Sequence, residues 1–126
     1  MFGSKATGDQ YTLTISNSTT LISCNVHSYS DDVVVRVPEG VTHIAPYALQ
    51  NCAGIQRIIL PSTLKEIGQA AFTGCLDLEA VYIPDTVKVL GAGIFRSCPK
   101  LKRVHVPQHI KDKTKTFERG LPSFLW

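Results

Sequence analysis

The chain has 126 residues, 44% of them hydrophobic and 18% charged, which is enough to form one domain with its own buried core. Its formal net charge of +3 somewhat favours an acidic partner and does not demand a dedicated nucleic-acid binder. Because the hydrophobic residues come in runs of only a few, the sequence as given shows neither a membrane-spanning stretch nor a secretory signal. We therefore expect a cytoplasmic protein; a surface or secreted location is the alternative if the sequence is a fragment.

The first third of the chain predicts a polar lead followed by a β-hairpin. Two short runs of alternating apolar and polar residues, 11–15 and 21–26, flank the polar stretch 16–20, which is typical of a hairpin turn. A further run, Val33 to Val37, overlays on later strand-like segments, so we interpret it as the strand of an incomplete repeat. Residues 1–33 are thus predicted to be an N-terminal lead and hairpin cap.

From residue 34 to residue 110 the sequence repeats with a period of 23 residues. The period is marked by a proline column and a cysteine column: Pro38, Pro61, Pro84 and Pro107, and Cys52, Cys75 and Cys98. A fixed period in this range indicates a solenoid, in which each repeat forms one coil and neighbouring coils share a core. We expect about three full coils.

Within one coil, the apolar columns predict which side chains point inward. They follow the spacing LxxLxL, as in Ile55 to Leu60, whose last two positions alternate as a strand does. A second inward pair lies on the opposite wall, and a short helical turn is expected after it. Asn51 and Gly74 end two of these turns with residues that tolerate positive φ, whereas Ser97 fits the third turn less well.

The middle repeat, LPSTLKEIGQAAFTGCLDLEAVYIP, resembles the BspA-like (Treponema-type) leucine-rich repeat, whose pattern includes IPxxVxxIGxxAFxxCxxLxxVxIP. The resemblance covers about Leu21 to Ile110. It implies a leucine-rich repeat solenoid with short parallel strands on one face and short helical turns on the other, closed by the N-terminal hairpin cap and by a C-terminal cap or tail, residues 111–126. It also implies a scaffold for protein–protein recognition, often adhesion or host contact when the protein is secreted.

Two rows of outward side chains on the predicted strands form the candidate binding surface, which in such a solenoid is the concave sheet face. One row is Val34, Arg57, Ala80 and Arg103, and the next is Arg36, Ile59, Tyr82 and His105. Arginine and aromatic side chains beside an exposed apolar residue are the composition of binding hot spots. Lysines near Arg103 would add a basic rim suited to carboxylates or phosphates. The residues predicted to contact the partner are Arg36, Arg57, Ile59, Tyr82, Lys102, Arg103 and His105. The alternative is an ordinary solvated face that maintains solubility.

The three cysteines of the repeat column are expected to pack as buried small hydrophobes, although stacked coils would bring neighbouring α-carbons within disulfide range. Cys24 lies outside the 23-residue register and is either part of the hairpin core or a spare thiol. Zinc ligation is disfavoured because the sequence has no C-x-x-C pair. We predict no metal and no cofactor.

The sequence contains no catalytic constellation. Pro107 lies between His105 and His109 and argues against a helical pair of metal-ligating histidines. The acidic residues fall mostly in different repeat columns, so no pair of carboxylates is expected to face a cleft. We therefore expect no enzyme activity.

The C-terminal stretch Phe117 to Trp126 contains two Phe, two Leu and the only Trp of the chain. It is either a lid over the open core of the last coil or a docking segment for a partner or a second copy. Loss of Phe124 and Trp126 would lower the melting temperature in the first case and abolish association in the second.

Three classes of function stay open from the sequence. The first is a non-enzymatic scaffold that binds a protein partner through the concave sheet face. The second is a nucleic-acid or polyanion binder with steep salt dependence, which would use the arginine row together with Lys100, Lys102, Lys111, Lys113 and Lys115. The third is a surface adhesin fragment. The identity of the partner and the oligomeric state are left open.

Overall fold

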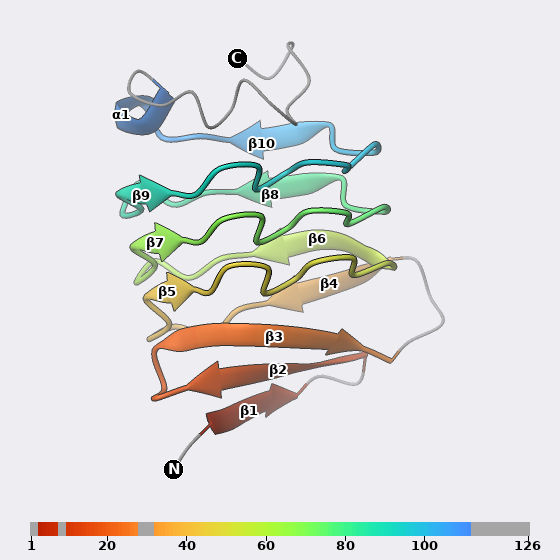
Figure 1. Cartoon of the computed structure of the whole chain (residues 1–126), viewed down its shortest axis with the longest axis vertical. Coiled ribbons are helices and arrows are strands. Elements are labelled where there is room, and N and C mark those ends of the chain that lie inside the picture. Colours follow the sequence, from red (N-terminus) through yellow and green to blue (C-terminus); the bar gives the residue numbers. More distant parts are fainter. Residues whose placement is uncertain (1–2, 8–9, 28–31, 112–126) are drawn as a thin grey trace.

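The computed structural model describes residues 3–7, 10–27 and 32–111, which form a β-solenoid with an antiparallel cap at its N-terminal end (Figure 1). Two sheets run along the stack. One is 6-stranded, in the order β1-β2-β3-β5-β7-β9, and the other is 4-stranded, in the order β10-β8-β6-β4. The strands are β1 (Gly3–Thr7), β2 (Tyr11–Ser16), β3 (Thr20–Val26), β4 (Val33–Arg36), β5 (His43–Ile44), β6 (Ile55–Ile59), β7 (Glu66–Ile67), β8 (Ala80–Tyr82), β9 (Val89–Leu90) and β10 (Arg103–His105). The described helix is α1 (Gln108–Lys111).

The cap contains the predicted hairpin and one strand more. β2 and β3 pair antiparallel around a turn in which Asn17 and Ser18 have φ of 53° and 61°. The polar lead contributes β1, which pairs antiparallel with β2 and which the sequence analysis did not predict. At its other edge β3 pairs in parallel with β5, and Leu21 lies opposite Ile44 in the register. The hairpin therefore provides the first strand on which the coils stack.

The four-stranded sheet is built from one strand of each coil. β4, β6, β8 and β10 pair in parallel, and the 23-residue period of the sequence becomes the register of the sheet. Ile58 lies beside Val81, and Val81 lies beside Val104. The core between the two sheets also contains the stacked rings of Phe72 and Phe95, with centroids 5.6 Å apart.

The predicted helical turns are hydrogen-bonded turns in the structure. Alternate amides bond from one coil to the next: Leu49 N–H donates to the carbonyl of Ala71, and Phe72 N–H donates to that of Ile94. The amides between them bond within the turn, as Ala48 N–H does to the carbonyl of Ala45. Amides that point along the stack cannot close an α-helix within one coil. The expected positive φ at the turn ends is confirmed, and Ser97 adopts it as well, with φ of 60°.

Gly68 and Gly91 allow the coils to approach closely on the wall formed by β5, β7 and β9. A Cβ atom on Gly68 would lie 2.5 Å from the backbone nitrogen of Pro46 in the preceding coil. A Cβ atom on Gly91 would collide with the backbone of Gln69 in the same way. In the first coil this column holds Ala45, whose preceding neighbour is the hairpin rather than another coil. Glycine is therefore required where coil packs on coil.

Candidate functional site

The outer face of the four-stranded sheet carries the two predicted rows, and we refer to it as the outer face. Arg57 lies beside Ala80 and Ala80 beside Arg103, while the neighbouring row joins Arg36, Ile59, Tyr82 and His105. The arginines, Tyr82 and His105 are exposed, and Ile59 is half-buried. The predicted register is thus confirmed; contact of these residues with a partner stays a prediction.

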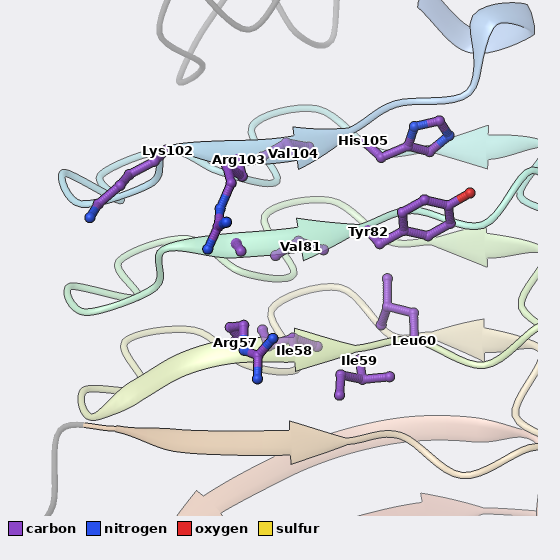
Figure 2. A pocket seen from close by; sticks show the side chains of 11 residues that line it. Arg57, Ile58, Ile59, Leu60, Val81, Tyr82, Lys102, Arg103, Val104 and His105 are labelled. Atoms are coloured by element: carbon purple, nitrogen blue, oxygen red, sulfur yellow. The ribbon is translucent and has the colours of Figure 1, made fainter.

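A groove with a volume of about 780 Å³ lies on this face over β6, β8 and β10 (Figure 2). Six of the seven predicted contact residues line it, namely Arg57, Ile59, Tyr82, Lys102, Arg103 and His105. Arg36 does not line the groove, because β4 lies one strand beyond it. Six of the eight side chains in the two predicted rows therefore line one groove.

Two aromatic side chains form one side of the groove. The rings of Tyr82 and His105 are stacked, with centroids 4.2 Å apart and planes 8° from parallel. Nε2 of His105 lies 3.3 Å from Oδ1 of Asp85, which holds the outer edge of the imidazole. Asp85 was not among the predicted site residues, and it follows directly the Pro84 that ends the repeat. The stack presents a preformed aromatic surface, with Tyr82 59% exposed.

The charged side chains of this region differ in their pairing. Lys100 Nζ lies 3.1 Å from Asp77 Oδ1, and Lys102 Nζ lies 3.4 Å from Glu79 Oε1. Within the described ranges the guanidinium groups of Arg57 and Arg103 have no ion-pair partner. The expected basic rim is therefore largely neutralised, which corrects the sequence analysis, and the uncompensated charge lies in the arginine row.

The two carboxylates connect three successive coils. Asp77 accepts a hydrogen bond from Gly54 N–H at 2.8 Å, and Glu79 accepts one from Gln56 Nε2 at 3.2 Å. The Gly54 amide and then Lys100 lower the pKa of Asp77, and Gln56 and then Lys102 lower the pKa of Glu79. Each carboxylate shares a repeat column with its partners, so the 23-residue alignment was the signal that could have identified these contacts.

The cysteine column is longer than predicted. Cys75 and Cys98 are buried as expected, whereas Cys52 is half-buried. Cys24 is not a spare thiol: it hydrogen-bonds to Cys52, which together with burial raises the pKa of the Cys24 thiol. Cys24 thereby extends the column into the cap, although its spacing in the sequence does not follow the period. All four thiols are free.

Some predicted features lie outside the described residues. These are Lys113, Lys115 and the stretch Phe117–Trp126; of Lys111 only the backbone is described. Within the described ranges no three His, Cys, Asp or Glu side chains gather in the arrangement of a metal site. None of the described helices is long and apolar enough to cross a membrane.

The stacked coils and the sheet face with its rows of side chains define a repeat scaffold of the leucine-rich class. The chain belongs to the family described as BspA type leucine-rich repeat region, which matches residues 6–119 in six copies. This confirms the resemblance stated from the sequence.

Two solved structures are similar to the chain. A leucine-rich repeat protein from Bacteroides ovatus is 27% identical, with a TM-score of 0.64 over 85% of this chain and 28% of that protein. A leucine-rich cell surface protein from Faecalibacterium prausnitzii is 22% identical, with a TM-score of 0.57 over 79% of this chain and 30% of that protein, and shows the fold alone. The chain thus spans less than a third of the length of either protein. No curated protein matches it.

Proposed function

We propose that the chain is a non-enzymatic recognition scaffold whose outer face, the predicted concave sheet face, binds a protein partner. The observation that carries this proposal is the pair of uncompensated arginines, Arg57 and Arg103, at a groove that also exposes the Tyr82–His105 stack. Arginine and tyrosine are enriched at binding hot spots, where a few residues contribute most of the binding free energy. The proposed contact residues are Arg36, Arg57, Ile59, Tyr82, Lys102, Arg103 and His105.

The sheet is a suitable support for such a surface. The proposed contact side chains on β6, β8 and β10 come from strands whose register is fixed by backbone hydrogen bonds and by an apolar row below them, in which Ile58 and Val81 are buried and Val104 is half-buried. Side chains on a rigid element lose less conformational entropy on binding than side chains on a loop. The backbone positions of the arginines and the stacked rings of Tyr82 and His105 are therefore set before the partner arrives.

A paired pull-down from lysate of the source organism tests the proposal. One bait is the unchanged chain and the other carries Arg57→Ala, Tyr82→Ala and Arg103→Ala. The matched control carries Tyr47→Ala, Lys88→Ala and Arg96→Ala, three exposed residues that do not line the groove. We expect a protein that the unchanged and control baits retain and the outer-face variant loses. Equal retention by all three baits, with equal melting temperatures, contradicts the proposal.

The same experiment separates the polyanion alternative. A nucleic-acid binder releases counterions from each phosphate contact, so its affinity falls steeply with salt. Because Lys100 and Lys102 are paired with Asp77 and Glu79, we expect little nucleic acid in the eluate and a shallow salt dependence. Selective capture of nucleic acid by the unchanged bait would favour the polyanion binder instead.

The proposed location is the cytoplasm, which suits four free thiols. A surface adhesin is the second candidate, because the similar Faecalibacterium prausnitzii structure is described as a cell surface protein. Protease treatment of intact cells distinguishes the two: a cytoplasmic protein survives, whereas a surface protein is digested. Both candidates use the same outer face.

A further inference from the structure

We propose that Arg57 and Arg103 form a clamp for one carboxylate above Ala80, and that the partner therefore presents an acidic residue in an extended peptide segment. We refer to Arg57, Ala80 and Arg103 together as the arginine clamp. This inference rests on the proposed function and specifies what the outer face recognises.

The register of the sheet places the clamp residues side by side on three adjacent strands. Arg57 on β6 pairs with Ala80 on β8, and Ala80 pairs with Arg103 on β10. Since neighbouring strands lie about 4.8 Å apart, the α-carbons of the two arginines are about 10 Å apart. Ala80 is half-buried and contributes only a methyl group, so the space above β8 is left to the longer side chains on either side. In Figure 2 the Arg103 side chain extends from β10 towards β8. The Arg57 side chain lies over β6 in the same view, so a change of its rotamer brings both guanidinium groups to one anion over Ala80.

The positive charge of Arg57 and Arg103 favours the binding of an anion at the arginine clamp. Neither guanidinium has an ion-pair partner within the described ranges, and the nearby carboxylates of Asp77 and Glu79 are already held by lysines and by Gly54 or Gln56. Two like charges beside each other repel, and an anion placed between them removes the repulsion. The planar guanidinium fork matches the two oxygens of a carboxylate and donates parallel hydrogen bonds to them.

The neighbouring row indicates a peptide rather than a polyphosphate chain. Ile59 and Tyr82 lie two residues further along the same strands, about 7 Å from the clamp along the strand direction. This is the distance between side chains i and i+2 of an extended peptide, which point to the same side. An acidic residue over Ala80 thus places an apolar residue of the same segment on Tyr82 and Ile59. A polyphosphate would instead bring a second charge onto this apolar surface, which disfavours it.

Three sets of nine-residue peptides provide the probe. Each set has randomised flanks around a fixed central residue, which is Glu, Gln or phosphoserine, and heparin serves as the polyanion. Binding to the unchanged chain is measured at two salt concentrations. We expect the best Glu peptides to bind at least tenfold more tightly than their Gln counterparts, with apolar residues enriched two positions from the Glu.

The decisive variants are Ala80→Glu and Ala80→Gln, which differ only in charge. A Glu at position 80 supplies its own carboxylate to both arginines. We therefore expect Ala80→Glu to bind the Glu peptides at least tenfold more weakly than Ala80→Gln does. Replacing both arginines by lysine retains the charge without the fork and is expected to reduce the preference for Glu over Gln. Melting temperatures of all variants serve as the folding control.

Other outcomes overturn the clamp. These are equal binding of Glu and Gln peptides, preference for phosphoserine or heparin with a steep salt dependence, or unchanged binding in Ala80→Glu. The clamp can fail while the proposed function holds: a protein partner that is lost with Tyr82→Ala and Ile59→Ala, yet retained by Ala80→Glu, would show that the outer face recognises something other than a carboxylate. If no outer-face variant affects any partner, both inferences fail.

Discussion

Tyr82 and His105 stack ring on ring across adjacent strands, with centroids 4.2 Å apart and planes 8° from parallel. The stack follows from the 23-residue period, which pairs the two residues in the parallel register of β8 and β10. Adjacent strands lie about 4.8 Å apart, which is close to the separation of stacked rings. Asp85 holds the outer edge of His105 and further limits its rotation. An aromatic surface of this kind is ordered before any partner binds.

We expect Tyr82→Ala to weaken partner binding by at least tenfold and to change the melting temperature little. The ring contributes contact area to the groove, but at 59% exposure it contributes little to the core. Binding is measured by titration against the protein recovered in the pull-down. Tyr82→Phe keeps the ring and is the control that should retain binding. Unchanged affinity in Tyr82→Ala would show that the stack is not a contact surface.

Acid is expected to destabilise the protein partly through Asp77. Its pKa is lowered in the folded state by the Gly54 amide and by Lys100, so its contribution to stability is present above the usual carboxyl pKa of about 4 and is lost as pH falls through the lower folded value. Asp77→Asn should lower the free energy of unfolding by about 1 kcal/mol at neutral pH. It should also make that free energy depend less on pH below about pH 4.

Urea unfolding at several pH values between neutral and acidic measures this effect. Ser62→Ala removes a different link between coils, the hydrogen bond that its hydroxyl donates to Glu39, and serves as a control that leaves Asp77 intact. If the unchanged chain and Asp77→Asn lose stability in parallel on acidification, the carboxylate is not the group responsible.

Gly68→Ala is expected to destabilise the fold by about 1–3 kcal/mol, the range typical of overpacking. Its added methyl group would lie 2.5 Å from the backbone nitrogen of Pro46, so the two coils would have to separate. Thermal and urea unfolding measure the loss. The matched control is Ala45→Gly, in the same column beside the hairpin, for which we expect a loss of stability of at most about 1 kcal/mol. A Gly68→Ala protein as stable as the unchanged chain would contradict the close approach of the coils.

The four thiols should differ in reactivity. The hydrogen bond from Cys24 lowers the pKa of Cys52, which is also half-buried, whereas a hydrogen bond to Cys98 and burial raise the pKa of the buried Cys75. We therefore expect iodoacetamide to label Cys52 first and Cys75 last in the native protein at neutral pH. Peptide mass spectrometry reads the order, and labelling in urea is the control in which the differences vanish. Early labelling of Cys75 would contradict the buried column.

The regular part of the fold was predictable because one period determines both the sequence pattern and the sheet register. Arg57, Ala80 and Arg103 share a column in the sequence and therefore share a row in the sheet. The sequence predicts helical turns because Asn51 and Gly74 suit the exit of a helix. Alternate amides of these turns instead bond to the next coil, which depends on neighbouring coils rather than on local sequence.

The sequence predicted which residues form the outer face, but it did not predict how their charged neighbours are paired. The rows gave the correct outward residues, yet the lysines next to them were interpreted as a basic rim. Aligning Lys100 with Asp77 and Lys102 with Glu79 in their columns would have revealed the ion pairs. The contact of Cys24 with Cys52 had no such signal, because the hairpin is antiparallel and does not follow the period.

The most direct test of the outer face as the binding surface is photo-crosslinking from two tyrosine positions. A photoreactive phenylalanine analogue is placed at Tyr82, in the groove, or at Tyr47, which is similarly exposed outside it. Each protein is irradiated in lysate of the source organism, and the crosslinked products are identified by mass spectrometry. We predict a specific protein adduct from position 82 and none from position 47. The same adducts from both positions, or an adduct from position 47 alone, would contradict this prediction.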